Sequence, residues 1–435
     1  MDCIVFVPGI MGTRLSAPGG DEVWPPTVLE TQLGYQRKAE LMRDDLVVGD
    51  IIRNVWCAEI YEPLIAQFKD IGYPEAGGAK RLVLFPYDWR RDLEDTAALL
   101  AAQLRKVAAD GATSITLVSH SMGGLICRLV LESGTYAGEP WFPKIKALLA
   151  LATPHLGAPL ALARVLGLDG ALGISGADFR EFAGDRRFPS GYQLLPAPGE
   201  AACWDAESLD LQPLDIYAQG TARRLGLKPE LLARARFVHD TLRAGTVPDH
   251  VRYFLFAGVG HRTVTRINVG DDGVRLTTTD DAGDGTVPLW SALPRSLQKQ
   301  LVSGDHSGFF KSKAFKAVFY RLLGANFPIP PLMAAETIEL SVQSLVLGPD
   351  QPIDALLAPL APVARIEGSI IIERTDDPAK PFTQFRPPAK VVYMGPETPQ
   401  LKLLLPPLGK TGHYRATFLG EPGKSEPVVF AVAQS

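Results

Sequence analysis

Short runs of apolar residues recur along the first two thirds of the chain, and longer segments with helical periodicity separate them. The apolar runs cover residues 4–7, 82–85, 115–118, 147–151 and 253–256. The helical segments cover residues 59–68, 95–108 and 125–131. Continuous apolar strands are typical of a parallel sheet that is buried on both faces. The pattern therefore predicts an α/β fold in which strands and helices alternate.

Two long stretches interrupt this alternation. Residues 24–53 are polar and contain prolines, and residues 158–249 contain helix-like pieces without a clear strand. Neither stretch has the continuous apolar character of the sheet strands. We expect both to be insertions that form a cap over one edge of the sheet.

The pattern changes after a proline-rich stretch at residues 327–331, Phe-Pro-Ile-Pro-Pro. Beyond it, short β-type runs are separated by Pro, Gly and Asp, which is typical of an all-β sandwich. These runs cover residues 337–346, 369–373, 390–393, 401–405, 414–419 and 428–432. We expect a first domain over residues 1–330 and a sandwich-like accessory domain over residues 331–435.

The composition is that of a folded globular protein, with 46% hydrophobic and 21% charged residues among 435. A formal net charge of -4 argues against nucleic acid as a partner, because nucleic-acid-binding domains carry a basic stripe. No apolar run is long enough to span a bilayer, and a strand-like run beginning at Cys3 leaves no room for a signal sequence. We therefore expect a cytoplasmic protein, unless a specialised secretion route delivers it.

Residues 115–126 are predicted to form a strand, a tight turn and the start of a helix, with Ser121 on the turn. In such a nucleophile elbow, strained backbone angles project the serine hydroxyl above the sheet, and the residues two before and two after must be small. Ser119 and Gly123 meet this requirement, although Ser119 replaces the glycine of the usual GxSxG pattern. The sequence thus predicts an α/β-hydrolase fold with Ser121 as nucleophile. A serine that merely caps the following helix is the alternative.

In this fold an acid and then a histidine follow the nucleophile along the chain. Asp284, in Gly-Asp-Gly-Thr-Val-Pro, and His306, in a loop of small residues, satisfy that order. Asp280 and Asp281 are close alternatives for the acid. His120 is rejected as the base because its side chain points away from the nucleophile on this turn. His155 either lines the site or, more in keeping with its position, has a structural role.

The hydrolytic reaction also needs donors for the developing oxyanion. One is the backbone N–H of Met122 at the start of the helix. We assign the second to the N–H of Ile10, because Gly9 and Gly12 on either side permit the backbone to approach the substrate closely.

No cofactor and no metal are expected. The acidic residues Asp271, Asp272, Asp280 and Asp281 lack the spacing of a calcium loop with its distal Glu, so a solvated turn explains them better. The strings Gly-Lys-Thr at 409–411 and Gly-Lys-Ser at 423–425 lack the upstream glycine of a phosphate-binding loop.

Several strings resemble the lecithin:cholesterol acyltransferase family in order, from about residue 3 to residue 325. They are Pro-Gly-Ile-Met-Gly at 8–12, Pro-Tyr-Asp-Trp-Arg at 86–90, Ser119 to Gly123, Gly283 to Val287, and His306. The resemblance implies an acyl-enzyme mechanism on lipid esters, with the nucleophile, acid, base and oxyanion donors at the positions given above. For Asp88 and Arg90 it implies a structural role on the oxyanion side. The β region after residue 331 and the lack of a secretory signal depart from the family pattern.

The sequence therefore predicts a lipase or phospholipase A that cleaves carboxylic esters of lipids through an acyl-enzyme on Ser121. Two alternatives stay open: transfer of the acyl group to an acceptor alcohol, and a non-catalytic scaffold with the hydrolase fold. The expected partner is a lipid or acyl-ester substrate. Residues 160–168 are either an acyl-chain or peripheral membrane-contact surface or a packed cap helix. The sequence does not identify the partner of the accessory domain.

Overall fold

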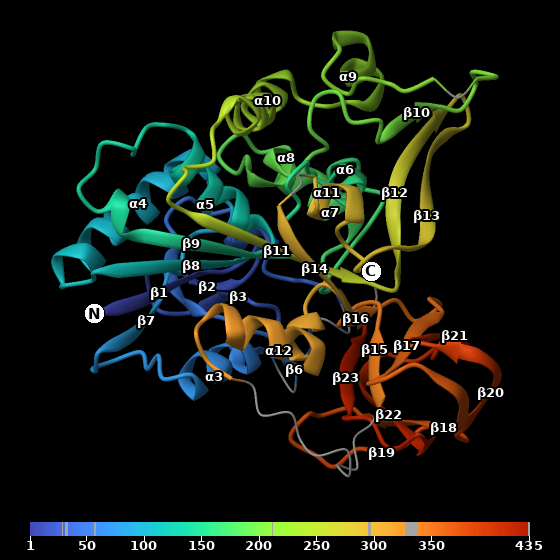
Figure 1. The fold of residues 1–435 in the computed structure, drawn as a ribbon. Helices are drawn as coiled ribbons and strands as arrows, with labels where there is room; N and C mark the ends of the chain where they lie inside the picture. Colours follow the sequence, from blue (N-terminus) through green and yellow to red (C-terminus); the bar gives the residue numbers. More distant parts are fainter. Residues whose placement is uncertain are drawn as a thin grey trace.

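The structure, a computed structural model, describes residues 1–27, 29–30, 34–55, 58–210, 212–294, 297–326 and 338–433. Over these residues the chain forms a central sheet with helices on its faces, a largely helical cap, and a β region toward the C-terminal end (Figure 1). The domain boundary expected at residue 330 lies outside the described residues and stays a prediction.

Within the described residues the central sheet has six strands in the order β14-β11-β9-β8-β1-β7, and every neighbouring pair is parallel. Their bounds are β1 (Asp2–Val7), β7 (Lys80–Leu84), β8 (Ser114–His120), β9 (Ile145–Leu151), β11 (Arg252–Val259) and β14 (Gln298–Ser303). The five predicted strands are all present. The edge strand β14 is additional, and its largely polar, exposed sequence explains why no apolar run marks it. Because the strands are parallel, all their carboxyl ends lie along one edge of the sheet.

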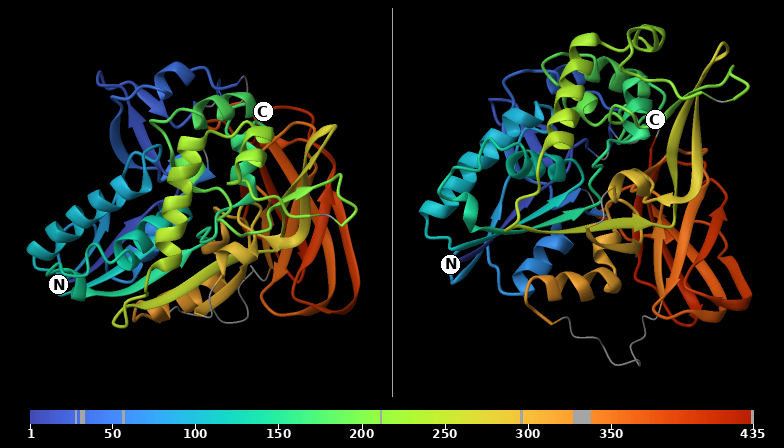
Figure 2. Two further views of the ribbon diagram at one scale, coloured as in Figure 1. Left: turned by 90° about the horizontal axis from the view of Figure 1, so that it is seen from above. Right: turned by 45° about the horizontal axis from the view of Figure 1, so that its top comes forward.

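Helices cover both faces of this sheet (Figure 2). One face carries α4 (Leu93–Ala109) and α5 (Met122–Glu132), and the other carries α3 (Glu62–Asp70) and α12 (Lys313–Leu322). Alternate residues of β1 serve the two cores: Val5 and Val7 pack into the α4 and α5 side, whereas Ile4 and Phe6 pack against α3 and α12. This two-sided burial is the reason that the strands read as continuous apolar runs.

The segment between β9 and β11 forms the cap. Its helices are α6 (Pro159–Val165), α7 (Gly176–Ala183), α8 (Ser190–Gln193), α9 (Gln219–Leu225) and α10 (Pro229–Ala244). It also contains the short strand β10 (Cys203–Asp205), so the expectation of no strand here was wrong. Three residues are too few to produce a periodic signal in the sequence.

A long hairpin, β12 (His261–Gly270) and β13 (Gly273–Gly283), follows β11 and extends beside the cap, where β12 pairs with β10. Asp271 and Asp272 form its turn, as the interpretation of a solvated turn predicts. Asp280 and Asp281 instead lie in β13, so that interpretation was wrong for them. Short helical elements complete this half of the chain: η1 (Phe142–Lys144), α11 (Leu289–Ala292) and η2 (Phe309–Lys311).

The first insertion is a small three-stranded sheet ordered β3-β2-β4, followed by a two-stranded ribbon. Its elements are β2 (Thr13–Ser16), β3 (Glu22–Trp24), α2 (Lys38–Leu41), β4 (Val47–Ile51), β5 (Asn54–Val55) and β6 (Ala58–Glu59).

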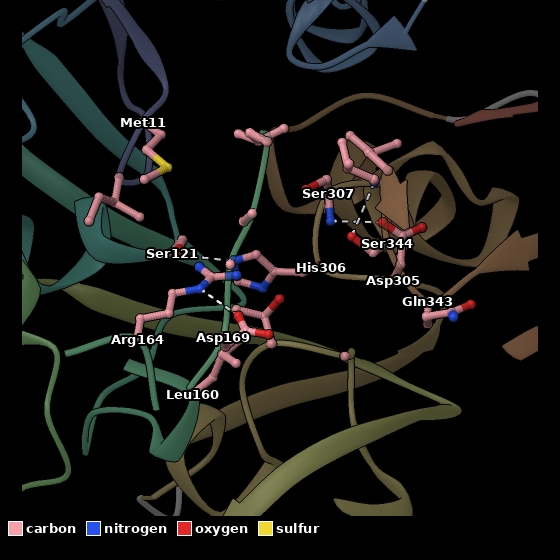
Figure 3. A pocket seen from close by; sticks show the side chains of 18 of the residues that line it. Met11, Ser121, Leu160, Arg164, Asp169, Asp305, His306, Ser307, Gln343 and Ser344 are labelled. Carbon is pink, nitrogen blue, oxygen red and sulfur yellow. Dashed lines mark hydrogen bonds and ion pairs between the residues drawn. The ribbon is translucent and has the colours of Figure 1, made fainter. Parts of the chain in front are cut away.

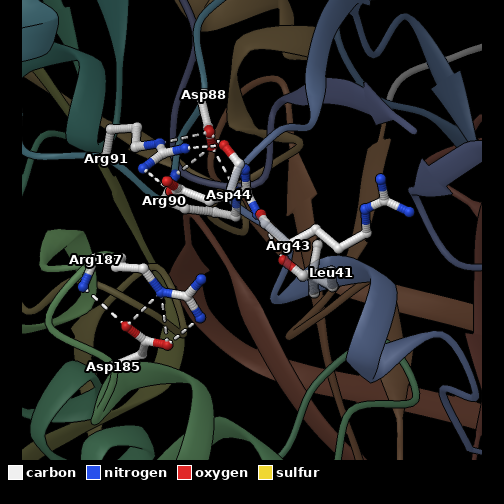
Figure 4. A network of polar contacts seen from close by, with 8 residues as sticks. All are labelled: Leu41, Arg43, Asp44, Asp88, Arg90, Arg91, Asp185 and Arg187. Carbon is white, nitrogen blue, oxygen red and sulfur yellow. Dashed lines mark hydrogen bonds and ion pairs between the residues drawn. The ribbon is translucent and has the colours of Figure 1, made fainter. Parts of the chain in front are cut away.

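A buried arginine joins this insertion to the main sheet (Figure 4). Arg90 is fully buried and forms two hydrogen bonds with the Asp88 carboxylate, while one guanidinium nitrogen donates to the carbonyl oxygens of Leu41 and Arg43. Its guanidinium also lies over the ring of Phe188 in the cap. The Asp-Trp-Arg string therefore connects three parts of the fold, which agrees with the scaffold role that the resemblance implies.

The C-terminal region consists of two sheets that share one hydrophobic core. The first contains β15 (Ile338–Val342), β17 (Ile353–Pro359) and β21 (Leu401–Leu405). The second contains β16 (Val346–Leu347), β18 (Val363–Thr375), β19 (Thr383–Gln384), β20 (Ala389–Thr398), β22 (Gly412–Glu421) and β23 (Val428–Val432). Side chains of both sheets meet in that core, so the region is a sandwich, as predicted. The sequence analysis missed β17, whose apolar run ends in a proline.

Among the described residues, no helix combines the length and apolar character needed to cross a bilayer. The cellular location stays a prediction.

Candidate active site

Ser121 lies on a strained turn between β8 and α5. Its backbone has φ 52° and ψ -127°, a conformation that non-glycine residues rarely adopt. A methyl group at Gly123 would lie 2.5 Å from the carbonyl oxygens of Val7 and Pro8, so only glycine fits two residues after the serine. This is the geometry predicted for a nucleophile elbow, and it differs from that of an ordinary helix cap, where no positive φ is required.

His306 lies between the other two predicted residues. Its Nε2 is 3.0 Å from the Ser121 hydroxyl oxygen, and its Nδ1 is 2.8 Å from Oδ2 of Asp284. The carboxylate of Asp284 accepts a hydrogen bond from the N–H group at Nδ1 of His306. Nε2 is then unprotonated and accepts the hydrogen bond of the serine hydroxyl. The structure thus brings together, in one hydrogen-bonded chain, the three side chains selected from the sequence.

Hydrogen bonds with backbone groups fix the positions of Asp284 and His306. The second carboxylate oxygen of Asp284 accepts the N–H groups of Thr286 and Val287 at 2.9 and 2.7 Å. The N–H of His306 donates to the carbonyl oxygen of Asp284 at 2.9 Å. Asp284 is 1% exposed, so water cannot solvate its carboxylate. The N–H groups of Thr286 and Val287 and Nδ1 of His306 supply the hydrogen bonds that a buried carboxylate needs.

The alternative acids lie elsewhere. Asp280 pairs with Arg262 at 3.0 Å, and Asp281 pairs with Lys402 of the C-terminal region at 2.7 Å. His155 is buried beside Arg128, whose guanidinium lies 3.4 Å from its Nδ1. This contact favours the structural role for His155.

The loop after β1 lies directly against the elbow. A methyl group at Gly9 would be 2.9 Å from Cβ of Ser121, and Ile10 lines the same cavity as Ser121. Met11 has a positive φ of 63°, and its carbonyl oxygen accepts the indole N–H of Trp24 at 2.9 Å. Met122 is the first residue of α5, where an N–H has no acceptor within the helix. Both assigned oxyanion donors thus belong to segments that flank the serine hydroxyl.

A buried pair of side chains beneath the elbow connects these segments. Nε2 of His120 lies 2.9 Å from the carbonyl oxygen of His306, and Nδ1 lies 2.8 Å from the hydroxyl oxygen of Tyr61. That oxygen in turn accepts the N–H of Gly9 at 2.9 Å. Burial lowers the pKa of His120 to about 3, so the ring is neutral. The sequence analysis rejected His120 as the base but missed Tyr61, which lies about sixty residues away and carries no motif.

A cavity of about 590 Å³ opens at Ser121 and His306. Figure 3 shows Met11 and Leu160 on one side of this pair and Ser307, Ser344 and Gln343 on the other. Leu160, Ala161, Arg164 and Val165 of α6 line the cavity, while Leu162 and Ala163 of the same helix are fully buried in the cap core. The segment is therefore a packed cap helix with one side on the cavity, and membrane contact stays a prediction.

Within the described residues, no group of three or more His, Cys, Asp or Glu side chains is arranged to hold a metal ion. The expectation of no cofactor stays a prediction, and the hydrogen-bonded chain described above contains protein groups alone.

Comparisons with known proteins show which proteins this chain resembles. The family model for lecithin:cholesterol acyltransferase matches residues 53–226. Among curated proteins, lecithin-cholesterol acyltransferase-like 4 of Arabidopsis thaliana is 22% identical over 351 residues, which cover 68% of this chain. The match spans 64% of that relative's length.

Solved structures resemble this chain at low sequence identity. A chain in the crystal structure of the Tle4-Tli4 complex aligns with a TM-score of 0.52 and 12% identity, over 72% of this chain and 96% of that chain. The mature form of Bacillus licheniformis lipase BlEst2 aligns with a TM-score of 0.39 and 16% identity, over 74% and 91%. The fold is that of the α/β-hydrolases, with additional all-β sheets. Together with the ordered motifs, these matches show that the chain is similar to the lecithin:cholesterol acyltransferase family over part of its length.

Proposed function

We propose that the protein is a serine hydrolase that cleaves carboxylic esters of lipids through an acyl-enzyme on Ser121. The observation that carries the proposal is the chain of hydrogen bonds from Asp284 through His306 to Ser121. Ser121 and His306 line the cavity. The cavity is lined by aromatic and aliphatic side chains of the cap and the first insertion, which suit an acyl chain. Similarity to a family whose name refers to acyl transfer between lipids supports the substrate class.

The proposed reaction begins with attack of the Ser121 hydroxyl oxygen on the ester carbonyl carbon. Nε2 of His306 accepts the hydroxyl proton, and the Asp284 carboxylate stabilises the imidazolium ion that forms. The N–H groups of Ile10 and Met122 donate to the oxyanion of the tetrahedral intermediate, where the loss of one such donor costs roughly 3 to 4 kcal/mol. His306 then protonates the leaving alcohol, and the acyl group stays on Ser121.

Hydrolysis follows when water attacks the acyl-enzyme and His306 again accepts the proton. An alcohol in place of that water would make the protein an acyltransferase, the reaction to which the family name refers. Both outcomes use the same three residues, so the acceptor distinguishes them.

Lipid mass spectrometry tests the proposal. The protein is incubated with phospholipids, neutral glycerides and simple acyl esters, with and without an added acceptor alcohol. We expect free fatty acid from the wild type and none from Ser121→Ala, while Ser133→Ala, at the other end of α5, retains the activity. Acylated acceptor that depends on Ser121 would indicate transfer. Equal products from wild type and Ser121→Ala on every ester would refute the enzymatic proposal and favour the scaffold alternative.

A further inference from the structure

The cavity beside Ser121 has two ends with different linings. Toward the cap and the first insertion its walls are mainly apolar, and they also contain the ion pair of Arg164 and Asp169. The apolar lining here comes from Trp24, Trp89, Leu160, Val165, Phe179 and Phe182. Several of these side chains belong to the buried cores of the cap and of the α5 side of the sheet. An extended acyl chain suits this end, because burial of each CH₂ group is favourable by about 0.8 kcal/mol.

The other end is bounded by the C-terminal region. Here the lining combines apolar residues such as Leu345, Val346 and Phe430 with a group of polar residues from both parts of the chain. The polar residues are Arg262, Asp305, Ser307, Gln343, Ser344 and Asp354. Figure 3 shows Ser307, Asp305, Gln343 and Ser344 together on the side of His306 that faces away from Met11 and Leu160. The reacting pair therefore lies between an apolar end and a polar end of one cavity.

The polar end has a fixed wall. Residues 343–345 connect β15 to β16, and we call them the C-terminal wall. The backbone N–H of Gln343 donates to the carbonyl oxygen of Asp354 at 3.0 Å, and the side-chain Oε1 of Gln343 accepts the N–H of Asp354 at 2.7 Å. The carbonyl oxygen of Leu345 accepts the N–H of Ala431 at 2.8 Å. Both ends of the wall are thus tied to neighbouring strands of the sandwich.

The wall also contacts the turn that carries the acid. Gly285, directly after Asp284, has φ +92°, and a methyl group on it would lie 2.6 Å from the carbonyl oxygen of Gln343. Nearby, the N–H of Arg262 donates to Oδ2 of Asp354 at 3.1 Å, and Nε2 of His261 lies 3.0 Å from the hydroxyl oxygen of Ser341. The sandwich therefore packs on the acid loop closely enough to shape the site.

We propose that the C-terminal wall binds the alcohol half of the ester, so that the sandwich selects substrates by their alcohol. This inference rests on the proposed function. An ester bound to Ser121 has its acyl chain on one side of the carbonyl carbon and its alcohol oxygen on the other, and the apolar end takes the acyl chain. The alcohol half then extends toward Ser307 and Ser344.

The chemistry of this end favours a polar alcohol that carries hydrogen-bonding groups. It offers a serine hydroxyl from each part of the chain, an arginine, and the carboxylates of Asp305 and Asp354. The two carboxylates are buried, at 8% and 7% exposed, and each accepts one backbone N–H, from Ser307 and Arg262 respectively. A carboxylate accepts several hydrogen bonds, so both favour donors on the ligand over apolar groups. A simple alkyl alcohol would add no such donor.

A two-by-two comparison of esters tests the proposal. One pair of substrates shares a long acyl chain and differs in the alcohol, a monoacylglycerol against a methyl ester. The other pair shares the methyl alcohol and differs in acyl length. For Ser344→Trp we expect the ratio of kcat/KM for the monoacylglycerol to that for the long methyl ester to fall at least tenfold. For Ala161→Trp in the cap, the ratio of long to short methyl ester is expected to fall instead.

Thr383→Trp, on the exposed face of β19, is the control for adding an indole to the sandwich, and we expect wild-type ratios from it. Ser344→Leu is a smaller second variant, and turnover of the long methyl ester reports that each variant has folded. Ratios that stay at the wild-type value in both folded Ser344 variants would overturn the inference alone. A wild-type protein that hydrolyses no ester would overturn the proposed function, and the inference with it.

Discussion

The hydroxyl oxygen of Tyr61 lies 2.8 Å from Nδ1 of His120, and this contact links the two loops that meet at the serine. Nε2 of His120 can only donate to the carbonyl oxygen of His306, so Nδ1 carries no hydrogen and accepts from Tyr61. The tyrosine oxygen then accepts the N–H of Gly9. The neutral imidazole of His120 thereby sets the direction of each hydrogen bond in the chain that runs from the loop of His306 to the loop of Gly9.

Tyr61→Phe removes the central member of this chain. The buried N–H of Gly9 and Nδ1 of His120 would both lose their partner, at a cost of roughly 1 to 3 kcal/mol in the free energy of unfolding for each unsatisfied group. Because the Gly9 loop carries the proposed oxyanion donor Ile10, kcat should fall about tenfold or more while KM changes less. Tyr35→Phe is a matched control, since Tyr35 is also buried and donates to one carbonyl, that of Val23. An equal loss of kcat in both variants would contradict a specific role for Tyr61.

The neutral state of His120 also predicts a pH dependence of stability. Burial lowers the pKa of His120 to about 3 and that of His239 in α10 to about 4. In the unfolded chain both rings titrate near pH 6.5, so between these values the unfolded state binds more protons and stability falls as the pH drops. We expect each ring to lower the free energy of unfolding by on the order of 2 kcal/mol between pH 7 and pH 5.

Urea unfolding at the two pH values measures this effect. His120→Gln and His239→Gln should each reduce the difference in unfolding free energy between pH 7 and pH 5 by a similar amount. Only His120→Gln should also reduce kcat at pH 7, because His239 contacts the carbonyl oxygen of Leu195 in the cap and lies outside the hydrogen-bonded chain of the site. If the difference in unfolding free energy between pH 7 and pH 5 is the same in both variants as in the wild type, the two rings titrate normally in the folded protein.

The choice of Asp284 over its neighbours can be tested directly. Asp284→Asn keeps the size of the side chain but removes the charge that stabilises the imidazolium ion, so kcat should fall by roughly 10³- to 10⁴-fold. Asp280→Asn and Asp281→Asn should retain activity within a few-fold, since their carboxylates pair with Arg262 and Lys402. Loss of activity in Asp281→Asn, with Asp284→Asn active, would reverse the assignment.

Much of this arrangement could be predicted from the sequence because the signals are local. Each central strand buried on both faces has a continuous apolar run, and the elbow at Ser121 depends on small residues two positions away. The order of the acid and histidine along the chain then selected Asp284 and His306. All three signals arise from short segments whose physical requirements are strict.

The features that were missed depend on distant contacts or on exposed strands. Tyr61 reaches His120 only because α3 and β8 are brought together by the fold, and nothing in the neighbouring sequence marks it. The edge strand β14 and the hairpin β12–β13 carry polar residues on open faces, so they lack an apolar run. The wall at Ser344 belongs to the site only through the packing of the sandwich on Gly285, a contact between parts of the chain about sixty residues apart.

The buried guanidinium of Arg90 predicts a large and local effect on stability. Arg90→Ala would leave the carbonyl oxygens of Leu41 and Arg43 without their donor and would leave Asp88 with Arg91 as its remaining ion-pair partner. Removing one partner of a buried ion pair typically costs about 3 to 5 kcal/mol. Arg43→Ala, which breaks an exposed pair with Asp45, should change stability by less than about 1 kcal/mol. Limited proteolysis should show cleavage within the first insertion in Arg90→Ala at protease levels that leave Arg43→Ala intact.

The close approach of the β1 loop to the elbow gives the sharpest test of the oxyanion assignment. A methyl group at Gly9 would lie 2.9 Å from Cβ of Ser121 and 3.2 Å from Nδ1 of His120, so Gly9→Ala must push the loop away from the serine. That displacement moves the N–H of Ile10 while leaving the hydrogen-bonded chain of Asp284 and His306 intact.

We therefore expect Gly9→Ala to lower kcat by about 10²- to 10³-fold, the effect of losing one oxyanion donor. Gly19→Ala is the control, because no atom lies within 4 Å of the added methyl group. Reaction with a fluorophosphonate probe, followed as a rate, checks the serine separately. A kcat close to the wild-type value in a folded Gly9→Ala protein would mean that the second donor does not come from this loop. The loop's close contact with Ser121 would then serve packing alone.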